Sequence, residues 1–278
     1  TTRGVTQTRV LTALGLAIPV VPLTLFLPTA GFACLAASIA ALAGWEWLAL
    51  EHGRTRMAVR LAYSFVVFVM VLGAWLIEPL WPFLMVCAFG FWCVLSGQIV
   101  VGIGRSVNPS FTAGYGLGIA VVVPGPLALT IIHGRTDSGP LLVLVFCIIV
   151  CSGDILAYFI GRAWGTRKLA PEISPGKTVE GTVGGIAGAV VAGMLCYGLW
   201  HTSEELAAFN PGTWLMIVIS VAAVSVIGDL TESVVKRNAG QKDSGSLLPG
   251  HGGVLDRVDG LLSAAPVFAV WLVVLGVF

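Results

Sequence analysis

Charged residues are scarce in this sequence. Lys, Arg, Asp and Glu together make up 10% of its 278 residues, whereas a soluble domain carries about 25%. Hydrophobic residues make up 57%, and the mean hydropathy is +0.95. The core of one soluble domain cannot bury this much apolar surface. The composition therefore excludes a soluble globular protein and predicts a polytopic membrane protein.

Two further classes of protein are excluded by what is missing. The six cysteines all fall inside apolar runs, and none forms a C-x-x-C pair or a Cys/His cluster. We therefore expect neither a disulfide framework nor a zinc site, and interpret the cysteines as small packing residues. The formal net charge is only +1, and no RNA- or DNA-binding motif is present, so no nucleic-acid partner is expected.

The apolar residues are gathered into long runs. A helix needs about 20 mostly apolar residues to cross a bilayer, and about nine runs have that length. They cover residues 10–28, 31–50, 58–77, 80–101, 111–132, 140–161, 179–200, 212–235 and 258–278. Prolines interrupt the first run. This pattern is compatible with a kinked hairpin formed by the first and second runs. Backbone groups inside a bilayer must pair within helices, so we expect an all-α fold, a polytopic transmembrane helical bundle.

Lys and Arg predict the orientation of the bundle. With nine spans and a cytosolic N-terminus, every Lys and Arg except Arg135 falls on the cytosolic side. This is the bias expected of membrane proteins. We therefore predict that the N-terminus is cytosolic and the C-terminus lies outside.

Charge is also uneven along the chain. Charged residues concentrate in 154–180 and 229–259, both on the predicted cytosolic side. We therefore predict one integrated membrane domain in which residues 1–110 are scaffold helices. Residues 111–278 are the catalytic helices, with cytosolic loops at 162–178 and 236–257.

The most concentrated polar pattern lies at the cytosolic end of the eighth predicted span. Asp229, Glu232, Ser233, Lys236 and Arg237 are spaced i, i+3, i+4, i+7 and i+8. On a helix these positions share an arc of about 140°. An ionisable residue within a span usually faces the bundle interior or a wet cavity, so this stripe is a candidate site.

A glycine-rich loop follows this stripe, and Asp256 and Asp259 then open the last span at i, i+3. Such a loop can bring backbone N–H groups against phosphate oxygens. Mg²⁺ prefers one or two carboxylates together with phosphate oxygens and water. Asp229 and Asp256, on neighbouring helix ends, are therefore the candidate Mg²⁺ ligands, and a second cation is left open. The alternative is a solvated loop with interfacial salt bridges.

A second polar pattern begins at Asp154, inside the sixth predicted span. Tyr158 and Arg162 follow on the same helix face, so Asp154 is either a site residue or a structural partner of Arg162. Farther along, Ser174 and Pro175 predict a helix start, with Ser174 as the N-cap.

The residues after Pro175 would then lie in the first turn of that helix. Lys177 and Thr178 would there bind an anion, although a lysine that merely anchors the helix at the interface is the alternative. Glycines at 181, 184, 185 and 188 predict a small-residue face for close helix packing.

Two weaker signals remain. Glu46 stands between Trp45 and Trp47. Interfacial anchoring explains the tryptophans, and Glu46 is a candidate member of the site. His251 lies within the loop sequence P-G-H-G-G. We expect it either to contact phosphate or to make hydrogen bonds within the loop.

These patterns resemble a known family. The stretch from Ser233 to Asp259, S-x-x-K-R-x-x-x-x-K-D-x-G-x-x-x-P-G-H-G-G-x-x-D-R-x-D, closely resembles phosphatidate cytidylyltransferase, also called CDP-diacylglycerol synthase. The stretch from Asp154 to Gly181 resembles the same family. Gly176 is a mild departure, because many relatives have Lys there.

The resemblance implies a reaction in which CTP and phosphatidic acid give CDP-diacylglycerol and pyrophosphate with Mg²⁺. It implies Asp229 and Asp256 as metal ligands, and a bacterial cytoplasmic (inner) membrane location with the site facing the cytosol. A homodimer is expected by analogy only. Acyl-chain preference, the choice between CTP and dCTP, and the number of metals are left open.

The expected mechanism is in-line attack of a phosphatidate oxygen on the α-phosphorus of CTP. The nucleophile is already an anion, so catalysis must come from positioning and charge neutralisation. The remaining candidate residues fall into three groups. Triphosphate or lipid phosphate would contact Lys236, Arg237, Lys242 and Arg257; Ser174, Lys177 and Thr178 would form a further phosphate cradle; Asp154, Ser233, Asp243, His251 and Asp259 would support them.

Two rival functions are considered. A CTP-dependent polyprenol or phytol kinase would attack the γ-phosphorus and release CDP instead of pyrophosphate. A membrane transporter would need polar groups that continue across the bilayer, and the outer half of the predicted spans has almost no charged residues. A CDP-alcohol phosphotransferase is excluded because its D-G-x-x-A-R motif is missing.

Overall fold

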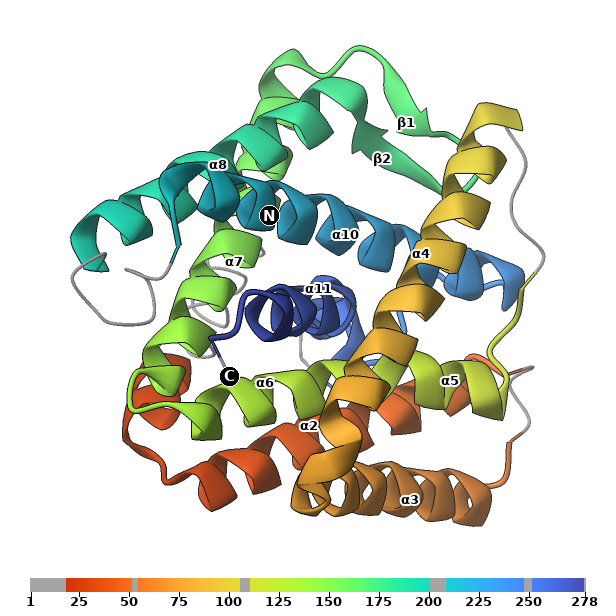
Figure 1. The fold of residues 1–278 in the computed structure, drawn as a ribbon. Helices are drawn as coiled ribbons and strands as arrows, with labels where there is room; N and C mark the ends of the chain where they lie inside the picture. The colour runs from red at the N-terminus through yellow and green to blue at the C-terminus, as the bar shows by residue number, and fades with distance from the viewer. Residues whose placement is uncertain (1–18, 52–54, 106–110, 201–208, 248–251, 278) are drawn as a thin grey trace.

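The computed structural model describes residues 19–51, 55–105, 111–200, 209–247 and 252–277. Within them the chain is a helical bundle with one small hairpin (Figure 1). The elements are α2 (Thr29–Ala49), α3 (Met57–Leu76), η1 (Glu78–Leu80), α4 (Trp81–Arg105), α5 (Tyr115–Val122), α6 (Pro124–Arg135), α7 (Gly139–Trp164), β1 (Lys168–Ala170), β2 (Ser174–Thr178), α8 (Val179–Trp200), α10 (Pro211–Asn238) and α11 (Leu255–Val274). The predicted all-α polytopic class is confirmed.

The described residues contain eight helices long and apolar enough to cross a membrane, with α5 and α6 together forming one of them. These eight match every predicted span except the first. Of that first span, 10–28, residues 19–26 are helical and 10–18 lie outside the described residues. In Figure 1 the C-terminal ends of α2, α4 and α10 lie on the same side as the N-terminal ends of α3 and α5. This alternation agrees with the predicted crossings, while the side that faces the cytosol stays a prediction.

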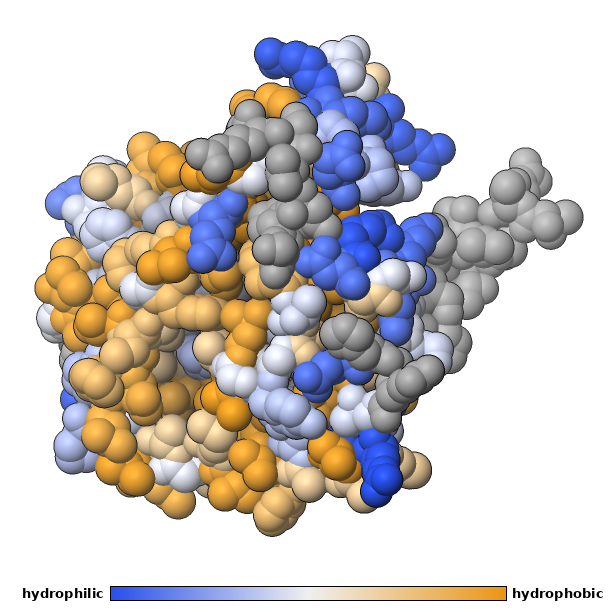
Figure 2. Space-filling view, turned by 90° about the vertical axis from the view of Figure 1, so that its right-hand side faces the viewer, coloured by the Kyte–Doolittle hydropathy of each residue, from blue (hydrophilic) through white to orange (hydrophobic). Residues whose placement is uncertain are grey.

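The bundle is apolar outside as well as inside. On α3, Val67 and Val71 are fully buried, whereas Phe65 is 68% exposed. Figure 2 shows hydrophilic residues gathered toward the upper right of one face, with apolar residues over much of the remainder. Large exposed apolar surfaces mark contact with lipid or a partner, and here they agree with helices that span a bilayer.

The last helix lies at the centre of the bundle. Figure 1 shows α11 between α10 and α6, and it packs against both and against α4. Phe146 of α7 stacks on Phe268 of α11 with ring centroids 5.5 Å apart, and Trp214 of α10 meets Phe268 edge-on. This packing places the N-terminal turn of α11, which carries Asp256, next to the C-terminal half of α10.

Glycines allow α7 and α8 to pack closely. A Cβ added at Gly185 would lie 2.7 Å from the carbonyl oxygen of Gly153 and 2.7 Å from the Cβ of Ala157. The predicted small-residue face of residues 181–188 is therefore a packing surface against α7.

Gly185→Val is expected to lower the stability of the bundle by about 1–3 kcal/mol, because the added side chain must push α7 away. The measurement is the thermal unfolding midpoint in detergent, followed by tryptophan fluorescence. Gly198→Val on the same helix is the control, since a Cβ there would have no heavy atom within 4 Å. Equal midpoints for the two variants would contradict this account of the packing.

The predicted helix start at Ser174 is wrong. Ser174–Thr178 is strand β2, paired antiparallel with β1 in the register Lys168 to Thr178. The helix begins at Val179, because Thr178 rather than Ser174 caps it: the Thr178 hydroxyl accepts the N–H of Gly181 at 3.1 Å. Pro175 is tolerated because both strands of a two-stranded sheet are edge strands, where the missing N–H of a proline costs little. Lys177 therefore reaches the site from a strand, not from a helical turn.

Candidate active site

The centre of the charged cluster is a buried lysine between two acids. Lys236 of α10 lies 2.9 Å from the Oε2 atom of Glu232 and 2.6 Å from the Oδ1 atom of Asp256. Lys236 is 9% exposed and Glu232 is 3% exposed. The predicted stripe on α10 is therefore helical, as expected, and its Lys236 contacts α11. Lys236 neutralises two carboxylates from neighbouring helix ends, which differs from the predicted role as a phosphate contact.

Asp256 is held by the loop that precedes it. Its Oδ2 atom accepts the N–H of Gly253 at 2.8 Å, the N–H of Ser244 at 3.0 Å and the hydroxyl of Ser244 at 2.9 Å. Gly252 makes the turn possible with a φ of +81°, a conformation that a side chain would disfavour. In the part of the loop that the structure describes, the N–H groups of Ser244 and Gly253 thus donate to Asp256, and contact of the loop with phosphate oxygens stays a prediction.

A second ion pair links the hairpin to α10. The Lys177 ammonium of β2 lies 2.7 Å from the Oδ2 atom of Asp229. The other Asp229 oxygen accepts a long hydrogen bond of 3.4 Å from the Ser233 hydroxyl. Both members of the pair are partly exposed, at 22% and 39% of their side chains. The structure therefore brings together Lys177, Ser233 and Asp229, which the sequence placed in one site.

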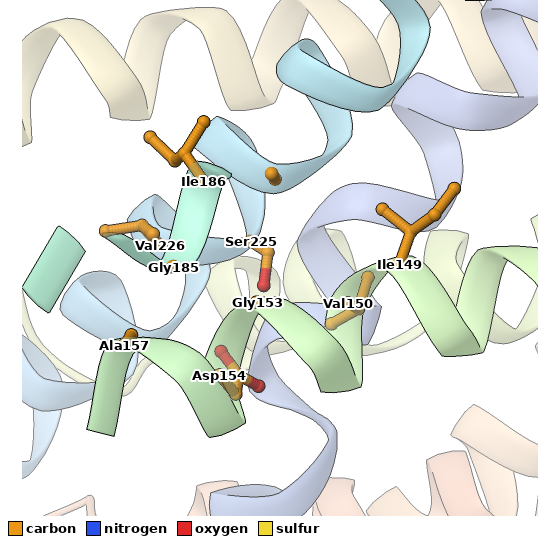
Figure 3. A pocket seen from close by; sticks show the side chains of 10 residues that line it. Ile149, Val150, Gly153, Asp154, Ala157, Gly185, Ile186, Ser225 and Val226 are labelled. Atoms are coloured by element: carbon orange, nitrogen blue, oxygen red, sulfur yellow. The ribbon is translucent and has the colours of Figure 1, made fainter. Parts of the chain in front are cut away.

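Asp154 lies on α7 beside a small cavity between α7, α8 and α10. Figure 3 shows Asp154 and Ser225 as the polar side chains among the labelled residues. Asp154 lies within electrostatic range of Asp229 and Lys177. In the part of the chain that the structure describes, the Arg162 guanidinium donates to the Tyr158 hydroxyl at 3.1 Å and forms no ion pair with Asp154. The alternative of an Asp154–Arg162 pair is therefore wrong.

Asp259 adds a third acid to this region. It lies on α11 within electrostatic range of Asp229 and Asp154, and its Oδ1 atom accepts the N–H of Gly260 at 2.8 Å. Carboxyl groups from α7, α10 and α11 thus lie within electrostatic range of one another, and Lys177 is ion-paired with one of them, Asp229. Carboxyl oxygens are donors that a hard cation such as Mg²⁺ prefers.

The donor set fits a hard divalent cation only in part. Among the described residues, no three His, Cys, Asp or Glu side chains form a ready-made metal cluster. A cation such as Mg²⁺ needs only one or two carboxylates when phosphate oxygens complete its shell. Asp229 is ion-paired on one oxygen and accepts only a long hydrogen bond on the other, so it fits this need. Asp256 has both oxygens engaged by protein donors, so it could bind a cation only by exchanging one of them.

The other predicted site residues occupy varied positions. Arg237 donates to the carbonyl of Gln241 at 3.1 Å and to the carbonyl of Ile173 at 3.4 Å, so it joins the loop to the hairpin turn. Lys242, Asp243 and Arg257 are exposed, Ser174 is half-buried, Thr178 is buried as the cap of α8, and His251 lies outside the described residues. Arg237 thus contacts backbone carbonyls, and contact of Lys242 and Arg257 with a phosphate stays a prediction.

Sequence reasoning missed two parts of the site. Ser244 is 1% exposed and contacts both Asp256 and Glu46; its place directly after Lys242-Asp243 was the available signal. Glu180 accepts hydrogen bonds from the backbone N–H groups of Thr166 and Arg167, each at 3.1 Å, and so ties the start of the hairpin to α8. The sequence pattern that could have indicated Glu180 is a single acidic residue at the beginning of an apolar run.

Comparisons with known proteins agree with this site. Residues 7–275 match the Cytidylyltransferase family, and the chain belongs to that family. It is 36% identical over 245 residues to a phosphatidate cytidylyltransferase of Pseudomonas aeruginosa, covering 87% of each chain. It is 38% identical over 264 residues to a phosphatidate cytidylyltransferase of Brucella abortus, covering 93% of this chain and 90% of the relative. The resemblance predicted from the motifs is confirmed.

Proposed function

We propose that this chain transfers the cytidylyl group of CTP to phosphatidic acid, giving CDP-diacylglycerol and pyrophosphate. The enzyme names of relatives that span most of the chain support this function. The observation that carries it is the presence of two ion pairs, Lys177–Asp229 and Lys236–Asp256, on adjoining elements of an apolar bundle, with Asp259 and Glu232 within electrostatic range between them. Such a cluster suits a lipid phosphate and a nucleotide triphosphate that must meet at a membrane.

The reaction makes modest demands on acid–base chemistry. An oxygen of phosphatidic acid, already an anion at neutral pH, forms a bond to the α-phosphorus of CTP. The bond between the α-phosphorus and its bridging oxygen to the β-phosphate breaks, and pyrophosphate leaves with that oxygen. Catalysis then rests on alignment and on neutralising phosphate charge.

The roles of the residues follow from their positions. Lys177 and the exposed Lys242 and Arg257 would bind phosphate oxygens, and Lys236 would hold Asp256 in place. Asp229 and Asp256 would hold Mg²⁺, with Asp256 exchanging a protein donor as described above. When bound, the cation would neutralise phosphate charge that builds up on the leaving group.

We also propose the cytoplasmic membrane of a bacterium as the location, with the site facing the cytosol. The distribution of Lys and Arg supports this side, and the relatives compared are bacterial. Withdrawing acyl chains from a bilayer costs about 0.8 kcal/mol per CH₂. The lipid therefore stays in the inner leaflet while CTP arrives from the cytosol.

Product analysis tests this function against the rival kinase. Purified protein is incubated with CTP labelled in the cytosine ring and Mg²⁺, with phosphatidic acid in one reaction and a polyprenol in another. We expect labelled cytidine in the lipid fraction and an equal amount of pyrophosphate, and neither product without phosphatidic acid. Release of CDP with phosphorylation of a polyprenol would contradict the proposal and favour a lipid kinase.

A further inference from the structure

The N-terminal half of the chain contributes one buried acid to the region of the site. Glu46 is the only charged residue of α2 and is 1% exposed. It lies far from the cluster in sequence but contacts the loop before α11. A carboxylate removed from water is costly unless it is hydrogen-bonded, so its contacts indicate what it does there.

The contacts of Glu46 converge on the start of α11. Its Oε2 atom accepts the N–H of Leu255, the first residue of α11, at 2.8 Å. The N–H groups of the first helical turn have no partner within the helix and must find one elsewhere. The loop also closes over the carboxylate: a Cβ added at Gly245 would lie 2.6 Å from Oε1, and one added at Gly253 would collide with Oε2. Glu46 therefore fixes both the loop and the helix start.

Ser244 connects Glu46 to Asp256. The Ser244 hydroxyl lies 3.1 Å from the Oε2 atom of Glu46 and 2.9 Å from the Oδ2 atom of Asp256. A hydroxyl has one proton to donate, so it can serve only one of these oxygens at a time. When Asp256 binds another partner, Glu46 remains as an acceptor for Ser244. The loop can then keep its shape while an Asp256 oxygen is released.

We infer that Glu46 is a positioning residue that orients Asp256 through Ser244 and the backbone of Leu255. This inference rests on the proposed function, in which Asp256 belongs to the site. Glu46 itself touches no reacting atom. Its effect is to hold the loop in the shape that presents Asp256 beside Lys236, and it acts as a hydrogen-bond acceptor from a scaffold helix.

The test compares variants Glu46→Ala, Glu46→Gln and Ser244→Ala with the control Glu78→Ala, an exposed acid in η1. We expect Glu46→Ala and Ser244→Ala to lower kcat for CDP-diacylglycerol formation at least about tenfold, and the KM for phosphatidic acid to stay within about threefold. Glu46→Gln keeps an acceptor oxygen and should stay within about threefold of wild type. The Glu46→Ala/Ser244→Ala double variant should lose little more than Glu46→Ala, because both changes break one contact chain.

Hydrogen–deuterium exchange gives a readout that does not depend on activity. Peptides covering residues 243–256 should exchange faster in Glu46→Ala and at the wild-type rate in Glu46→Gln, while α3 is unchanged. If the wild type made no CDP-diacylglycerol, the proposed function would fail, and exchange alone would still decide whether Glu46 holds the loop.

The inference is overturned by any of three results: Glu46→Ala keeps activity within twofold of wild type, Glu46→Gln loses as much as Glu46→Ala, or the effects of Glu46→Ala and Ser244→Ala multiply. If Glu46→Ala does not fold, Ser244→Ala decides, because it removes the shared hydroxyl and keeps Glu46. Wild-type activity in Ser244→Ala would then contradict the inference.

Discussion

Asp256→Asn is expected to lower CDP-diacylglycerol formation at least about 100-fold, in the range seen when a preorganised charge is removed from an active site. The two Asp256 oxygens accept from Lys236, Ser244 and Gly253. An asparagine must turn its NH₂ group toward one set of these donors. The variant thus loses the negative charge and the orientation of the loop together. Initial rates with CTP and phosphatidic acid measure the effect.

The same contacts indicate that Asp256→Asn also destabilises the protein. From the sequence alone this variant would be expected to fold normally. A buried donor left without an acceptor costs about 1–3 kcal/mol, so a lower melting temperature is expected. Asp137→Asn, at an exposed acid on the predicted outer side, is the control for both measurements. Retention of substantial activity in Asp256→Asn would remove Asp256 from the reacting site.

Lys236→Met is expected to cause the largest loss of stability, about 3–5 kcal/mol, the usual effect of breaking a buried ion pair by removing one partner. Lys236 is the cation between Glu232 and Asp256, at 2.9 and 2.6 Å. Without it, two neighbouring carboxylates lie in a poorly hydrated site with no compensating charge. The thermal unfolding midpoint in detergent should fall, and activity should be lost as well.

Two comparisons test this explanation. Lys168→Met, at an exposed lysine of β1, should leave the midpoint almost unchanged. Adding Glu232→Gln to Lys236→Met should restore part of the lost stability, because it removes one of the two repelling charges. A double variant less stable than Lys236→Met would show that Glu232 stabilises the bundle independently of Lys236.

The helices could be predicted because a bilayer imposes their length and composition. The span at 179–200 coincides with α8, and the last predicted span, 258–278, lies a few residues later than α11, Leu255–Val274. The stripe from Asp229 to Arg237 could be placed on one helix face because its spacing follows the helical period. The division into a scaffold at 1–110 and a catalytic part at 111–278 stays a prediction.

The contacts between elements could not be predicted. Ser174-Pro175 and Thr178 both carry capping signals, and only the pairing of β2 with β1 decides between them. The partners of Lys236 depend on how α11 packs beside α10. Glu46 and Ser244 are 198 residues apart in the sequence, and no local pattern relates them. The sequence therefore supplied candidate residues for the site, but it could not supply the contacts that these residues make with one another; their predicted phosphate and metal partners stay predictions.

The pair of Lys177 and Asp229, 2.7 Å apart, has a consequence for the order in which ligands enter. Each is the counterion of the other. A triphosphate that arrived alone would therefore pair with Lys177 and leave Asp229 without this counterion. A triphosphate that carries its divalent ion offers both of them a new counterion at once. Lys177 then pairs with the triphosphate and Asp229 with the divalent ion, so neither side chain is left without a counterion. We therefore expect nucleotide and metal to enter as one complex, with the ion pair between Lys177 and Asp229 opening as they do.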